Sequence, residues 1–255
     1  MKKLMKKLTI VTLVIIMLLI AFCGCKAGED PDETERDNYD PKYEETGDAL
    51  TDIKLWLDTE GFVARMSQGT FVSILAAYEY NGVFYGETES GMTYYDGAYG
   101  GGCEGNYEGI SFHNDYRWSP ETKIATYYNT CTISVNLDNM FFPYGVRIGK
   151  PMKAYWESFG IDEEMLSEID FDEEIVVSSN EDATLVFKKL DNIYWEASDR
   201  RYQITYTEKT QIMLNDETPD DVTRTMVFYF VEDEAGETVL SHIMIKVLEE
   251  YPNNY

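Results

Sequence analysis

The last third of the chain alternates apolar and polar side chains with the period of a β-strand. Met226, Phe228 and Phe230 occupy every second position of one run. Successive side chains of a strand point to opposite faces, so this pattern places one face of a sheet on a core. Strands are expected at 175–178, 184–189, 193–197, 202–214, 222–231 and 238–248. The turn 232–236 connects the last two, which predicts an antiparallel sheet.

The preceding part adds further strands and two short helices. Strands are expected at 62–65, 71–80, 83–86, 110–112 and 124–137, with Asn81-Gly82 as a hairpin turn. Asp48 should cap a helix over 49–58, because Leu50, Ile53 and Leu57 recur at helical spacing. A short acidic helix is expected over 163–169. The sequence therefore predicts an α+β domain over 49–255, as one body or as two packed halves with a boundary near residue 138.

A glycine-rich segment over 94–109 is predicted to be a loop, since it contains six glycines. It carries Tyr94, Tyr95, Tyr99 and Tyr107, and Trp118 follows it. Tyrosines on a glycine scaffold can form a recognition surface, or they can cover a β-core. These five aromatic residues are the candidate binding face. The segment lacks the Lys-Ser or Lys-Thr ending of a phosphate-binding loop, so nucleotide binding is not supported.

The N-terminus has the pattern of an export signal. Several lysines precede an unbroken apolar run over 8–22, and this run is shorter than the roughly 20 residues of a membrane-spanning helix. The Gly24-Cys25 pair that follows resembles the lipobox of bacterial lipoproteins, in which a small residue precedes a cysteine that receives diacylglycerol. The resemblance implies a signal peptide over 1–24, lipid attachment at Cys25 and a membrane anchor on the extracytoplasmic face. A retained N-terminal helix is the alternative.

The residues after the leader are strongly acidic. Positions 25–48 contain many carboxylates, two prolines and almost no aliphatic side chains, which predicts a disordered tether. The whole chain has a formal net charge of -26. Because nucleic-acid phosphates repel such a polyanion, nucleic-acid binding is disfavoured.

Cys103 and Cys131 remain as a pair in the exported part. Outside the cytoplasm two such cysteines can form a disulfide, which would close a loop of about 28 residues and stabilise the fold by about 3 to 4 kcal/mol. Two buried free thiols are the competing interpretation.

The segment from Phe141 to Gly149 leads into a predicted helix with Pro151 at its first position and Gly160 at its end. This glycine-ended segment followed by a helix closed by Phe-Gly-Ile resembles small export modules of the beta-lactamase-inhibitor-protein-like and SmpA-like kind. The resemblance implies a binding or scaffold protein rather than an enzyme, with this helix covering the sheet.

No catalytic, metal or cofactor site is predicted. Cys103, His113 and Asp115 can be written as a nucleophilic triad, but no motif supports their contact. Asp170, Asp172, Glu174 and Glu181 have the spacing of a calcium loop, yet Ile175 stands where that loop needs glycine.

The leading expectation is a membrane-anchored extracytoplasmic lipoprotein with a non-enzymatic binding or scaffold role towards an envelope protein or peptide. The alternatives are a carbohydrate-binding surface module, whose exposed aromatic residues would stack on sugar rings, and a hydrolase of unrecognised type.

Overall fold

The computed structural model describes residues 40–62, 84–85, 92–97, 100–107, 109–136, 141–153, 155–171, 173–190, 201–212 and 220–252. One compact folded unit extends over Pro41–Tyr255. The leader, Cys25 and most of the tether lie outside the described residues, as do the strands expected at 71–80 and 193–197 and the Asn81-Gly82 turn.

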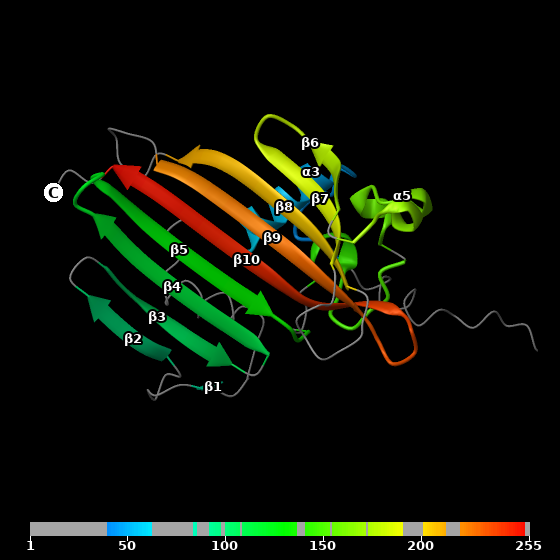
Figure 1. The fold of residues 1–255 in the computed structure, drawn as a ribbon, viewed down its shortest axis with the longest axis horizontal. Helices are drawn as coiled ribbons and strands as arrows, with labels where there is room; N and C mark the ends of the chain where they lie inside the picture. Colours follow the sequence, from blue (N-terminus) through cyan, green and yellow to red (C-terminus); the bar gives the residue numbers. More distant parts are fainter. Residues whose placement is uncertain are drawn as a thin grey trace, which may run out of the picture. The chain divides into compact units, whose positions relative to one another are not determined.

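In the described part of the chain, ten strands form one antiparallel sheet, which confirms the α+β class (Figure 1). The strand order is β1-β3-β4-β5-β10-β9-β8-β7-β6, and β2 also pairs with β3. The strands are β1 (Phe84–Tyr85), β2 (Met92–Gly97), β3 (Gly100–Tyr107), β4 (Ile110–Ser119), β5 (Ile124–Ile133), β6 (Glu174–Ser179), β7 (Ala183–Leu190), β8 (Arg201–Ile212), β9 (Asp220–Glu232) and β10 (Thr238–Pro252).

The sheet consists of two meanders that share one ladder. Strands β2 to β5 pair in chain order, and so do β6 to β10. The last strand of each meander meets the other, with Cys131 of β5 opposite Ile245 of β10. The two halves considered from the sequence are therefore continuous parts of one sheet.

The predicted loop over 94–109 is wrong, because most of this segment forms the β2–β3 hairpin. Tyr94 pairs with Cys103, and Tyr95 pairs with Gly102. Glycine weakens a strand through its backbone entropy but does not prevent pairing. Here β3 pairs with β4 along its whole length, and this tertiary pairing overrides the local preference of the glycines.

The helix α3 (Ala49–Thr59) confirms the first predicted helix, and the Asp48 side chain accepts a hydrogen bond from the backbone N–H of Thr51. The second predicted helix is present as α5 (Glu163–Glu168), capped by Asp162. Both caps satisfy backbone donors that the first helical turn leaves unpaired.

The predicted helix from Pro151 to Gly160 is wrong. Pro151 forms a β-bridge with Val239, and the N–H of Met152 donates to the carbonyl of Thr238 at 2.9 Å. This pairing with the start of β10 holds the segment in an extended and turn conformation. In the described residues of this segment, the only helix is the 3₁₀ helix η2 (Glu157–Phe159), which ends at Gly160 with φ of 77° as a left-handed cap.

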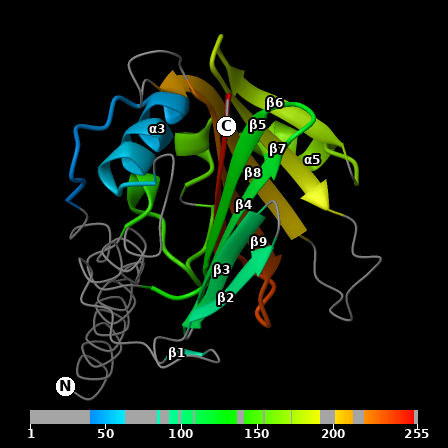
Figure 2. The same cartoon turned by 90° about the vertical axis from the view of Figure 1, so that its left-hand side faces the viewer.

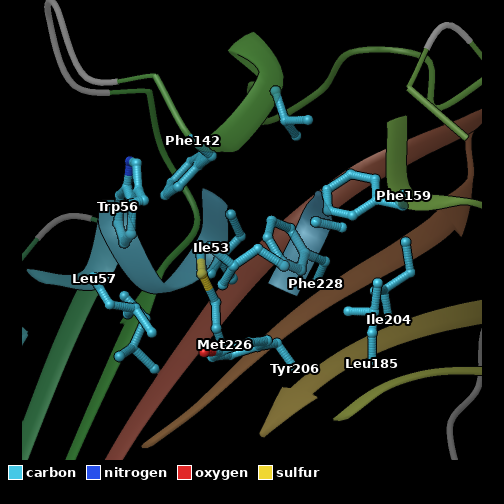
Figure 3. Packing of buried hydrophobic residues seen from close by; sticks show 14 of the residues in the cluster. Ile53, Trp56, Leu57, Phe142, Phe159, Leu185, Ile204, Tyr206, Met226 and Phe228 are labelled. Carbon is cyan, nitrogen blue, oxygen red and sulfur yellow. The ribbon is translucent and has the colours of Figure 1, made fainter. Parts of the chain in front are cut away.

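One face of the sheet carries the core, covered by α3 and the segment 141–161 (Figure 2). Ile53, Trp56 and Leu57 of α3 are fully or almost fully buried. Figure 3 shows them above strand residues that include Met226 and Phe228. The Trp56 ring lies 5.5 Å from that of Phe142, and its Nε1 donates to the carbonyl of Phe141 at 2.8 Å, which joins the two covering elements.

The folded unit begins before the predicted boundary at Ala49. The buried Asp52 carboxylate accepts hydrogen bonds from the N–H of Thr46 at 2.7 Å, the N–H of Gly47 at 3.0 Å and the Tyr144 hydroxyl at 3.0 Å. Glu45 in turn accepts from the N–H of Tyr144 at 3.0 Å. Residues 45–47, predicted as the end of a disordered tether, are thus bonded to the domain.

The predicted disulfide between Cys103 and Cys131 is absent, because Cys131 is a buried free thiol. Strand β4 lies between the strands of the two cysteines. Neighbouring strands are about 4.8 Å apart, so the Cα atoms are separated by more than the roughly 7 Å that a disulfide spans.

Candidate binding surface

The face of the sheet opposite α3, called the outer face here, is turned towards the viewer in Figure 1. Side chains of directly paired residues lie on the same face of a sheet. The register therefore identifies two rows that cross the strands at right angles. We call them the valine row and the threonine row.

The valine row starts at β6 and ends on β5. It consists of Val176, Val186, Thr205, Val227, Met244 and Thr132, each paired with the next. Val227 in its centre is only 3% exposed, whereas Val176 at the end is 60% exposed. The row is therefore mostly apolar, is buried at Val227 and becomes accessible at the edge of the sheet.

The threonine row runs beside it and consists of Thr184, Thr207, Thr225, Lys246 and Thr130. The hydroxyl oxygens of Thr207 and Thr225 lie 3.5 Å apart. Neither row contains a carboxylate, although the chain carries 47 acidic residues. The centre of the outer face is thus neutral to weakly basic in a strongly acidic molecule.

These two rows were not predicted from the sequence, although a repeated spacing of threonines indicates them. Threonines recur two apart as Thr130-Cys131-Thr132, Thr205-Tyr206-Thr207 and Thr223-Arg224-Thr225. Each triplet places two threonines on the outer face and a core residue between them. The sequence shows this alternation within each strand, but it does not show which strands lie side by side.

Strand β6 forms the end of the sheet, and of the described residues only β7 pairs along it. We call the opposite side of this strand the β6 edge. Val176 and Phe171, which are 60% and 55% exposed, lie at this end of the sheet. Edge strands present unpaired N–H and C=O groups, so this edge is a template for an added strand.

Carboxylates flank β6 in the sequence. The segments from α5 through β6 to the start of β7 carry exposed acidic residues before, within and after this strand. They are Asp162, Glu163, Glu164, Glu168, Asp170, Glu173, Glu174, Glu181 and Asp182. Between residues 161 and 190 the only basic residues are Lys188 and Lys189.

An open groove of about 950 Å³ lies between α3 and the ends of β7, β8 and β9. Tyr206 and Glu208 line its buried side. One carboxylate oxygen of Glu208 accepts from Arg224 and the other from the Tyr206 hydroxyl. Burial and the adjacent Glu208 carboxylate raise the pKa of Tyr206. Both Glu208 oxygens thus have partners within the folded domain.

The burial of Arg224 was also not predicted from the sequence, because a charged residue in an alternating strand is expected to face the solvent. Its side chain is 4% exposed and also contacts Asp58 at 2.6 Å and the carbonyl of Phe62 at 3.2 Å. The Lys54 and Arg224 cations outweigh partial burial and lower the pKa of Asp58. The network joins the end of α3 to the centre of the sheet.

Of the five predicted aromatic residues, only Trp118 has a described side chain, because the side chains of Tyr94, Tyr95 and Tyr107 lie outside the described part of the structure. Tyr99 lies outside the described residues. Trp118 is half-buried, with the Lys123 ammonium 5.5 Å from its ring centre.

The Cys103–His113 dyad is not formed either. Position 103 pairs with Asn114, and His113 pairs with Glu104, so the two positions belong to opposite faces. His113 Nδ1 lies 3.9 Å from Glu104. His242 stacks on Tyr229 at 4.4 Å.

The calcium-loop pattern does not form a loop. Glu174 belongs to β6 and lies 3.4 Å from Lys188, while Asp172 is not among the described residues. In the described ranges, no group of three or more His, Cys, Asp or Glu side chains is arranged to hold a metal ion.

Comparison of the sequence with protein-family models and with curated proteins finds no match. Within the described residues no helix has the length and apolar character needed to cross a membrane.

Proposed function

We propose that this chain is a membrane-anchored extracytoplasmic lipoprotein that binds an envelope protein or peptide without catalysing a reaction. The leader and Gly24-Cys25 support the location. A diacyl group on Cys25 would hold the domain at the membrane, and the acidic tether would separate the two.

The observation that carries the binding role is the exposed apolar end of the valine row at the β6 edge. Exposed apolar groups next to unpaired backbone are a recurring means of peptide recognition, in which the backbone supplies affinity and alternate side chains supply specificity. Because the feature that supports binding is an exposed sheet edge, a polypeptide is preferred to a glycan as the ligand.

Two measurements test this proposal. Intact-mass analysis of the native protein should give a chain that begins at Cys25 and carries acyl mass, and Cys25→Ser should release the protein from the membrane fraction. Proximity labelling from the domain in living cells should then mark envelope proteins. A chain that begins at Met1, or recovery of glycan alone, would overturn the respective half of the proposal.

A further inference from the structure

We infer that the β6 edge binds an extended segment of a partner polypeptide that alternates basic and apolar residues, and that this segment adds to the sheet as a strand. The inference rests on the proposed binding function and assigns it a place and a class of ligand. It depends on three independent features of β6, namely its backbone, its exposed apolar groups and its charge.

Among the described residues only β7 pairs with β6, which leaves the backbone on the other side of this strand open to an added strand. Its ladder with β7 runs through Glu174, Ile175 and Val176 and resumes at Ser178 after a bulge. Sheet edges are protected by lysine or proline, which β6 lacks, and also by charged side chains and bulges, of which β6 has Glu174 and one bulge after Val176. The bulge bends the strand locally, so an added strand would follow a bent and twisted edge.

The side chains at this edge favour an apolar contact. The described chain has three large hydrophobic residues that are markedly exposed, and two of them, Val176 and Phe171, lie at this end of the sheet. Inward-facing Ile175 and Val177 pack against the core and fix the strand in place. An added strand would cover Val176 with an apolar side chain at every second position, because paired residues share a face.

The charge around the edge selects a basic partner. Of the two lysines in this region, Lys188 lies 3.4 Å from Glu174, and Lys189 lies 4.6 Å from the Phe171 ring centre and donates to the carbonyl of Ile169. The exposed carboxylates of α5, β6 and the β6–β7 turn outnumber them. A second copy of this chain would bring the same carboxylates to the edge, whereas lysines or arginines would be attracted.

The test uses the full-length protein in a neutral detergent and a blocked octapeptide of four Lys-Val repeats, with four Glu-Val repeats as the control peptide. Hydrogen exchange followed by mass spectrometry should show slower exchange of the amides over 174–179 with the Lys-Val peptide only. Binding should weaken as salt rises, since exposed charges are screened. Protection elsewhere, or none, would overturn the inference.

Matched variants separate edge binding from general attraction to an acidic protein. Val176→Lys places a charge at the exposed edge, and Thr122→Lys adds the same charge at an exposed position of the turn between β4 and β5. Val176→Lys should weaken peptide binding at least tenfold, while Thr122→Lys should change it less than twofold. Equal losses would refute the inference, and melting curves confirm that both variants fold.

Failure of this inference can be distinguished from failure of the proposed function. If the peptide leaves the β6 amides unprotected while proximity labelling still marks envelope proteins, the edge is excluded and the binding role stands. If the β6 amides stay unprotected and proximity labelling marks no envelope protein, both the edge inference and the proposed binding function are refuted.

Discussion

At the scale of single residues, the most consequential feature is the charge network buried around Arg224. The Arg224 and Glu208 side chains are 4% and 3% exposed. A buried pair gains little net stability over apolar residues, but removing one partner leaves the other charge buried without compensation.

Arg224→Met should therefore lower the free energy of unfolding by about 3 to 5 kcal/mol, because Glu208 loses its cation. Urea denaturation measures the change. Lys54→Met is the control, since Lys54 forms an exposed pair with Asp58, and such a pair contributes no more than about 1 kcal/mol. A loss at Arg224 as small as that of the control would contradict the buried network.

The Cys131 thiol should make the fold sensitive to alkaline pH. Burial raises its pKa from 9.0 to about 12. The folded state then keeps a proton that the unfolded state releases, so stability falls as pH rises from about 9 towards 12. Between pH 8.5 and 10.5 the wild-type protein should lose about 2 kcal/mol more than Cys131→Val, measured by urea denaturation. An identical pH dependence in the two proteins would show that this thiol is not buried.

At the scale of elements, the turn between β3 and β4 depends on one glycine. Gly109 has φ of 73°, and a Cβ atom there would lie 2.1 Å from Val135 Cγ1. Its carbonyl accepts from the N–H of Ser134 at 2.8 Å and from its hydroxyl at 2.9 Å. The turn therefore has room for neither a side chain nor a large shift.

Gly109→Ala should destabilise the protein by at least about 2 kcal/mol, because the strain of a left-handed alanine adds to the overlap with Val135. Gly149→Ala separates the two effects, since Gly149 has φ of 79° with no atom within 4 Å of the added Cβ. It should cost about 1 to 2 kcal/mol. Thermal unfolding of both variants provides the comparison, and equal shifts in Tm would argue against the close approach of Val135.

Local patterns predicted those elements whose local preference agrees with their tertiary surroundings. The alternation in β9 and the capped periodicity of α3 are such cases. The β2–β3 hairpin was missed because glycines give no strand signal, and the Pro151 segment was mispredicted because its backbone bonds to β10, nearly ninety residues later. The β6 edge could not be foreseen, since the order of strands in a sheet is decided by pairing between distant segments.

At the scale of the whole chain, composition determines the net charge, and the strand order determines which strand lies at the end of the sheet. A net charge of -26 disfavours contact with anionic surfaces, while the ladder order places two rows without carboxylates across the centre of the outer face and leaves β6 at the end of the sheet. A strongly acidic domain with one apolar strand edge is suited to an extended basic ligand, and the proposed lipid at Cys25 would keep it in the envelope where that ligand is encountered.

The most direct test is site-specific photo-crosslinking in living cells, with a photoreactive phenylalanine analogue at position 176 or at exposed Thr51 of α3. We expect a light-dependent adduct with an envelope polypeptide from position 176 and none from position 51. Equal adducts from both positions, or a full-length protein recovered from the cytosol without an adduct, would contradict this expectation.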